Sequence, residues 1–100
     1  MKNKNRIPKS FTLGGLKFKV ETKEKVKPAG GSSDPFECII QISKTVKNSK
    51  CSEDYQRQTF YHELVHQIFI ALGELKLSDK EKLIQRFSLL LDQFEQTKEF

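Results

Sequence analysis

The sequence lacks any long apolar run. No segment of its 100 residues approaches the roughly 18 consecutive apolar residues of a membrane-spanning helix, and the lysine-rich start lacks the apolar stretch of a signal peptide. Cysteine is also scarce. Cys38 and Cys51 are the only two, and without a secretory signal we expect free thiols rather than a disulfide. These absences predict a cytoplasmic protein that does not enter a membrane.

The chain is long enough for one domain and too short for a second hydrophobic core. Its net charge of +5 is unevenly spread, because residues 1–27 carry nine basic and two acidic side chains. Such a segment could bind a nucleic acid, but no aromatic residues interleave with its lysines as a stacking platform would require. We therefore interpret residues 1–10 as a flexible basic tail and residues 11–100 as the single domain, and we expect no nucleic-acid partner.

Alternation of apolar and polar residues predicts two strands. Leu16, Phe18 and Val20 alternate with charged residues in a strand that extends as far as Val26. A Gly- and Ser-rich stretch at 28–35 is typical of a loop. A second strand follows at 36–46, where Cys38, Ile40 and Ile42 alternate with polar residues. Its lysines at 44 and 47 are typical of an exposed sheet edge.

Two helices fill the second half of the chain. The first runs from about Ser52, a good N-cap, to Leu72, with Gly73 as the stop. The second runs from Ser78 to about Gln96. Its apolar stripe is expected to cover the first helix or the sheet, and consists of Leu83, Ile84, Phe87, Leu90, Leu91 and Phe94. The pattern predicts an α+β domain with an antiparallel sheet of two or three strands, a central helix and a covering C-terminal helix.

An HExxH pentapeptide, His62-Glu63-Leu64-Val65-His66, lies inside the first predicted helix. Helical residues four apart project from one face, so the two imidazoles are placed to bind a single Zn²⁺. Glu63 sits one step round the helix, where its carboxylate reaches a water on the metal as a general base. Two solvated histidines are the alternative. The metal site is favoured because these are the only histidines and the following segment is too apolar for a surface helix.

Two histidines and a water leave one position on tetrahedral Zn²⁺ for another protein ligand. The sequence has no third histidine, so a carboxylate must complete the site. Glu81 is one candidate, because it lies in the first turn of the second predicted helix. Ser78 and Glu81 also form a capping-box pattern, in which Glu81 bonds the backbone of Ser78 and needs no metal. The other downstream carboxylates are Glu74, Asp79, Asp92, Glu95 and Glu99. Of these, Glu74 and Asp92 are the main rivals to Glu81, and Cys51, just before the helix, is a further candidate.

Three segments of the chain carry a family resemblance: residues 58–66 around HExxH, residues 81–87, and the leucines at 89–91. Residues 7–15 add a looser likeness. In these segments the chain resembles the small zincin metallopeptidases of phages and mobile elements, related to the ImmA/IrrE-like family. The resemblance implies a minimal zincin-like domain, with a small antiparallel sheet packed on the zinc helix. It also implies that a glutamate from the next helix is the third ligand, which favours Glu81.

The motif and the resemblance together predict a zinc-dependent peptidase. His62, His66 and Glu81 hold Zn²⁺, Glu63 takes a proton from the metal-activated water, and a peptide or protein is the substrate. We expect an extended substrate to add as a strand at the edge formed by residues 36–46. Two alternatives stay open. One is a non-catalytic, zinc-stabilised domain that binds a partner, although such a domain has no use for the base. The other is a basic nucleic-acid-binding accessory protein.

Overall fold

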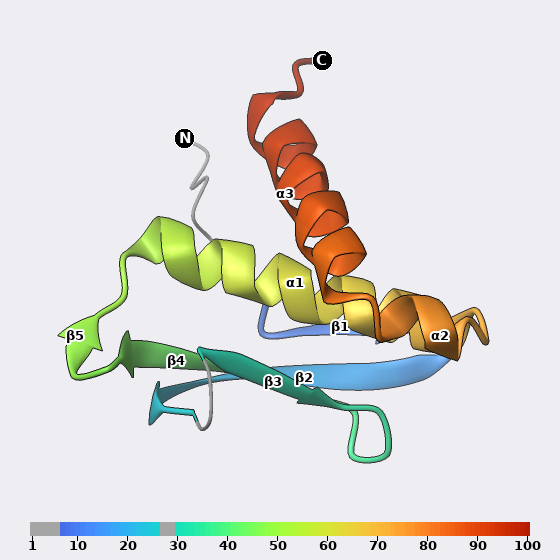
Figure 1. The fold of residues 1–100 in the computed structure, drawn as a ribbon, viewed down its shortest axis with the longest axis horizontal. Helices are drawn as coiled ribbons and strands as arrows, with labels where there is room; N and C mark the ends of the chain where they lie inside the picture. Colours follow the sequence, from blue (N-terminus) through green and yellow to red (C-terminus); the bar gives the residue numbers. More distant parts are fainter. Residues whose placement is uncertain (1–6, 27–29) are drawn as a thin grey trace.

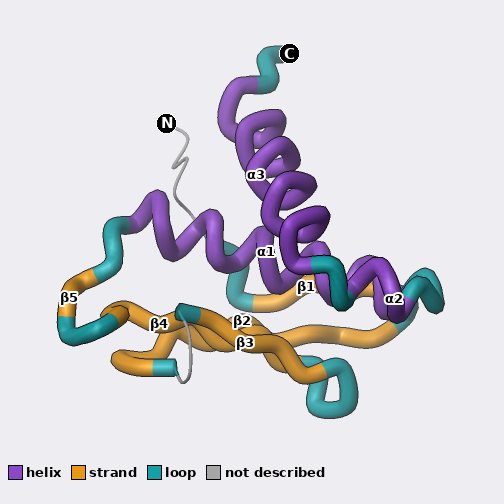
Figure 2. The backbone as a smooth tube through the Cα atoms, viewed as in Figure 1, coloured by secondary structure: helices purple, strands orange, loops and turns teal. Residues whose placement is uncertain are grey.

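The computed structural model describes residues 7–26 and 30–100, and it confirms the α+β class (Figure 1). Residues 1–6 of the predicted tail lie outside the described part, and Ser10 already begins a strand. The elements, in chain order, are β1 (Ser10–Leu13), β2 (Leu16–Lys25), β3 (Gly31–Asp34), β4 (Ile39–Val46), β5 (Ser49–Lys50), α1 (Glu53–Ala71), α2 (Leu75–Ser78) and α3 (Glu81–Thr97). The strands form one layer, α1 packs on it, and α3 packs on α1 (Figure 2).

The sheet is mixed and five-stranded, which corrects the predicted antiparallel sheet of two or three strands. Its order is β1-β2-β4-β3, with β5 also paired to β4. β2 and β4 run parallel, and the other pairs are antiparallel. The predicted loop at 28–35 contains β3, whose Gly, Ser and Asp residues have low strand propensity. This strand exists because β4 supplies backbone hydrogen-bond partners for it.

β4 is an internal strand rather than the predicted edge, because β2 pairs with one side of it and β3 and β5 pair with the other. It begins at Ile39, three residues later than predicted. The Asp34 carboxylate accepts a hydrogen bond of 2.8 Å from the Phe36 backbone N–H. Cys38 has a φ of 56°, which is a turn conformation. These features close the β3–β4 turn where the strand was expected to start.

The core lies between the sheet and α1. Ile40 and Ile42 of β4 pack with Phe60 of α1, and all three are buried. The charged side of β2 faces the opposite way, and its exposed lysines are Lys17, Lys19, Lys23 and Lys25. Because side chains alternate across a strand, these lysines occupy the face of the sheet away from α1. This confirms that they form the solvent-facing side of a strand.

α1 has the ends that the sequence predicts. The Ser52 hydroxyl accepts a hydrogen bond of 3.0 Å from the Tyr55 backbone N–H, which caps the N-terminus of the helix. Leu72 is the C-cap, and Gly73 follows with a φ of 80°. Glycine adopts this left-handed conformation without a steric penalty, so the helix ends here.

α3 buries only part of the predicted stripe. Ile84 is buried and Leu91 is half-buried, whereas the apolar side chains of Leu83, Phe87, Leu90 and Phe94 are partly or largely exposed. The other buried residues of the helix are Ser88 and Asp92. A buried ion pair explains the choice of face. The Arg57 guanidinium on α1 donates to both Asp92 carboxylate oxygens, with N–O distances of 2.6 and 3.0 Å. The hydrogen bond to Asp92 raises the pKa of Arg57, so the guanidinium stays charged.

Candidate metal centre

α1 places the two histidines of the HExxH motif on one side of the helix. Their ring centroids are 5.0 Å apart, which is the separation expected one helical turn along a face. Both side chains are mostly buried, because α2 and α3 fold back over this part of α1. The Nε2 atoms of His62 and His66 turn toward the same point, where the start of α3 lies against α1.

Glu81 occupies that point. It is the first residue of α3, and its carboxylate lies between the two rings. Oε1 is 3.1 Å from the Nε2 atom of His62, and Oε2 is 3.3 Å from the Nε2 atom of His66. One ligand atom from each of the three residues lies within 4.8 Å of the others. His62, His66 and Glu81 therefore form a candidate metal site of two imidazoles and one carboxylate.

The capping-box role of Glu81 is wrong for this fold. The N-cap of α3 is Lys80, and no side-chain hydrogen bond caps this helix. Ser78 is instead the last residue of α2, one turn earlier. Its hydroxyl lies against His66, at 3.1 Å from the ring Nδ1 atom. Asp79 and Lys80 separate Ser78, at the end of α2, from the first turn of α3, and the two side chains of the proposed box both face the histidines.

The other nitrogen of each ring has its own partner. The Nδ1 atom of His62 is 2.8 Å from the side-chain carbonyl oxygen of Gln85, which only accepts hydrogen bonds. The Ser78 hydroxyl oxygen lies 3.1 Å from the Nδ1 atom of His66 and 3.4 Å from the backbone carbonyl oxygen of the same residue. These contacts at Nδ1 turn the Nε2 atom of each ring toward Glu81. Partners of this kind fix the tautomer and the orientation of metal-binding histidines.

The three groups converge in a way that suits a cation. The Nε2 atoms of His62 and His66 lie 3.1 and 3.3 Å from the two Glu81 carboxylate oxygens, which is hydrogen-bond distance. A proton on one ring nitrogen bridges only that ring to the carboxylate. A single bound metal cation satisfies all three groups at once.

The donor set fits Zn²⁺. Two imidazole nitrogens and one carboxylate oxygen are ligands that zinc takes in proteins, at about 2.0–2.2 Å. Two atoms bound at these distances to one tetrahedral ion lie about 3.4 Å apart. The observed N–O separations of 3.1 and 3.3 Å are close to this value. These two separations end on different oxygens of the Glu81 carboxylate, and one ligand atom from each residue lies within 4.8 Å of the others, so the side chains must draw closer to bind one ion.

The three rival ligands lie elsewhere. Asp92 is held by Arg57 in the buried ion pair between α1 and α3. Cys51 is buried before the start of α1 as a free thiol. Glu74 is exposed and precedes α2 as its N-cap. None of them belongs to the histidine group in the described part of the chain.

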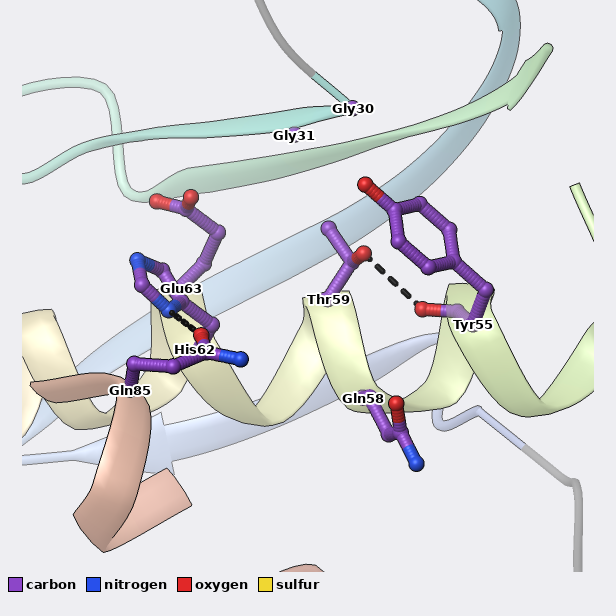
Figure 3. Close-up of a pocket in the computed structure, with 8 residues that line it drawn as sticks. All are labelled: Gly30, Gly31, Tyr55, Gln58, Thr59, His62, Glu63 and Gln85. Carbon is purple, nitrogen blue, oxygen red and sulfur yellow. Dashed lines mark hydrogen bonds between the residues drawn. The ribbon is translucent and has the colours of Figure 1, made fainter. Parts of the chain in front are cut away.

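Glu63 lies on the side of α1 that faces β3, next to a small groove (Figure 3). The groove lies between β3 and α1 and is lined by Gly30, Gly31, Tyr55, Gln58, Thr59, His62, Glu63 and Gln85. Gly31 allows the close approach of the two elements. A Cβ atom at this position would lie 2.5 Å from the Thr59 methyl carbon and 3.6 Å from the Glu63 Cγ atom. The glycine therefore brings the edge strand beside the predicted base.

Sequence reasoning missed Gln85 and Ser78, which orient the histidines. Gln85 follows Glu81 by four residues, so helical spacing alone places both on one face of α3. That spacing could have identified it. Ser78 was instead interpreted as a helix cap, and only the break between α2 and α3 shows its other contact. The groove was missed because β3 was interpreted as a loop.

Replacing Ser78 with alanine is expected to weaken zinc affinity about 10–100-fold, because His66 loses the partner that orients its ring. Ser88→Ala is the matched control. Ser88 is also a buried serine of this region, but its hydroxyl donates to the backbone carbonyl of Gln85 and contacts no histidine. Competition titration with a zinc chelator measures both affinities. Equal losses in the two variants would show that Ser78 acts only through packing.

No protein-family model, curated protein or solved structure matches the chain. The likeness to zincin peptidases therefore remains an inference from the motif and its flanking residues. Within residues 7–26 and 30–100, no helix has the length and apolar character needed to cross a membrane.

Proposed function

We propose that the protein is a zinc-dependent peptidase with a minimal zincin-like fold. One observation carries the proposal: the HExxH helix turns both histidine Nε2 atoms toward Glu81, while Glu63 between them faces a groove beside an edge strand. A structural zinc site is normally closed by four protein ligands. Here the described residues supply three, and the neighbouring groove leaves room for a substrate.

Zn²⁺, when bound by His62, His66 and Glu81, would supply Lewis acidity to a peptide carbonyl and to a water molecule. Among the described residues, Glu63 is the only acidic one that lines the groove. It follows His62 directly and shares the groove with it, so it is placed to take a proton from the water as general base. Gln85 and Ser78 contact the Nδ1 atoms and so orient the imidazoles with Nε2 toward the metal position.

The substrate we propose is an extended peptide that pairs with β3. The expected docking at β4 is wrong because both sides of that strand are occupied. β3 pairs with β4 alone in the described part of the chain, so its other backbone edge is available for β-augmentation. The groove beside it has a volume of about 190 Å³. This is below the ~300 Å³ of typical small-molecule pockets, and it suits one side chain of a bound strand.

Incubation of the zinc-loaded protein with a mixture of denatured proteins tests the proposal. We expect new peptide termini that appear with time, are detected by mass spectrometry, and disappear when a chelator removes the zinc. Re-addition of zinc should restore cleavage. A protein that binds zinc with the predicted ligands but generates no new termini would contradict the peptidase and favour a non-catalytic, zinc-stabilised binding domain.

A further inference from the structure

The face of the sheet away from α1 carries a row of exposed lysines. All three helices lie on one side of the sheet (Figure 1), and α1 packs on β3 and β4 from that side. Four lysines of β2 are exposed on the other side, namely Lys17, Lys19, Lys23 and Lys25. From the first to the last, the extended strand measures about 27 Å. This face therefore presents a linear array of positive charge.

Most of these charges have no acidic partner. Glu21 is the one carboxylate in the row, and it lies 3.9 Å from Lys23 and accepts a hydrogen bond of 3.2 Å from Gln41. The residues opposite the lysines on β1 and β4 are uncharged, and they are Ser10, Thr12, Ile39, Ser43 and Thr45. The described residues include every acidic side chain of the protein, and none of them forms an ion pair with Lys17, Lys19 or Lys25. Three charges of the array are thus not neutralised.

The two layers of the molecule differ in the sign of their charge. The strands and their loops, residues 7–26 and 30–51, carry eight basic and four acidic side chains, a net of +4. The helical part, residues 52–100, carries six basic and nine acidic ones, a net of −3. A charge distribution of this kind orients an approaching polyanion toward the sheet. The metal centre lies between α1 and α3, so a polyanion on the open face of the sheet leaves it free.

We propose that this face binds the phosphate backbone of duplex nucleic acid without reading its sequence. B-DNA carries one negative charge per about 1.7 Å of its axis, so a duplex meets lysines along the whole array. An acidic peptide would need a continuous run of carboxylates of the same length. Lysine ammonium groups and serine or threonine hydroxyls are common donors to phosphate oxygens. Ser10 and Thr12 are exposed beside Lys19 and Lys17 and supply such hydroxyls.

The positions of the aromatic rings favour a duplex over a single strand. Proteins bind single strands by stacking the bases on aromatic side chains. The aromatic residues of the described strands are Phe11 and Phe18, which stack on each other with ring centroids 5.2 Å apart, and Phe11 also contacts Phe60 of α1. Both rings therefore lie on the side of the sheet that faces α1. The expectation of no nucleic-acid partner rested on the lack of a stacking platform, and a duplex needs none because its bases stack inside it.

Fluorescence anisotropy with a labelled DNA duplex of about 20 bp, roughly two helical turns, tests the proposal. Each phosphate contact contributes about 0.9 to the slope of log K against log salt, so the array predicts a slope of about −3. The affinity of the natural sequence should then fall roughly 60-fold between about 50 and 200 mM salt. A Lys17→Gln, Lys19→Gln double variant should lose about two units of slope, so that its affinity falls only about 4-fold over this range. A duplex of different sequence should bind equally well.

A Lys76→Gln, Lys82→Gln double variant is the matched control, because it changes the net charge equally but alters exposed lysines of the helical layer. Its slope should match that of the natural sequence, and circular dichroism should be unchanged in both variants. Unchanged slope in the Lys17, Lys19 variant, or equal losses in the two variants, would overturn the assignment to the sheet face. Failure to bind the duplex at about 50 mM salt, or tighter binding of a single strand, would also contradict it. Displacement of the duplex by polyglutamate at equal charge concentration would instead make an acidic protein the partner. Peptide hydrolysis enters none of these measurements, so their outcome is separate from that of the proposed function.

Discussion

Replacing His62 with alanine is expected to abolish zinc binding, whereas the natural chain should bind about one equivalent. The change removes one of three ligands and leaves Glu81 and His66 with too few donors for a tetrahedral ion. Elemental analysis after dialysis, followed by a zinc titration, measures the loss. His66→Ala should behave in the same way, because its Nε2 atom is equally close to Glu81.

Gln58→Ala is a suitable control for the histidine variants. Gln58 lies one helical turn before His62 and lines the same groove, but it supplies no ligand atom. Its replacement should leave zinc binding intact. Thermal unfolding offers a second readout, because a ligand at 100 times its Kd stabilises the folded state by about 2.7 kcal/mol. Zinc should raise the Tm of the Gln58 variant and not that of the His62 variant. Full zinc occupancy in His62→Ala would exclude the site.

The Glu63→Gln variant is expected to keep its zinc and its fold while losing about 10²–10⁴-fold in the rate of peptide hydrolysis. The amide has nearly the same shape as the carboxylate but does not accept a proton from water. Glu63 is half-buried beside β3, so an isosteric change preserves the packing against Gly31. The rate of terminus formation from a cleaved peptide, measured at equal zinc occupancy, gives the comparison.

Glu74→Gln serves as the control for charge alone, because Glu74 is exposed and lies outside the groove. Its turnover should match the natural sequence. Undiminished turnover in Glu63→Gln would show that another group is the base. Loss of zinc from this variant would instead make Glu63 a ligand, which its orientation toward β3 argues against (Figure 3).

Local sequence information predicted α1 almost completely. The signals that end the helix are Ser52, the acidic first turn and Gly73, and each acts on backbone groups only a few residues away. The helix ends therefore follow from local hydrogen bonds and backbone preferences. β2 was predicted for the same reason, since its alternation is a local pattern. β3 was not, because its residues favour a loop and its pairing partner lies later in the chain.

The exposed stripe on α3 shows where pattern reasoning fails. A helix with one apolar face is expected to bury that face against its own domain. Here a charged pair determines which face of α3 is buried, because Asp92 must reach Arg57 to be buried without a large desolvation penalty. Ile84 and Ser88 lie on the same side of α3 as Asp92 and are buried with it. The exposed stripe consists of Leu83, Phe87, Leu90 and Phe94.

The sequence by itself determined the helix that carries HExxH and the projection of both histidines from one face, because helical geometry places residues four apart on the same side. Only the tertiary structure decided which residues contact the two histidines. The reversal through α2 and the Arg57–Asp92 pair set α3 across α1, and this brings Glu81, Gln85 and Ser78 to the rings. These contacts join residues 12 to 23 positions apart, and no local preference encodes such distances.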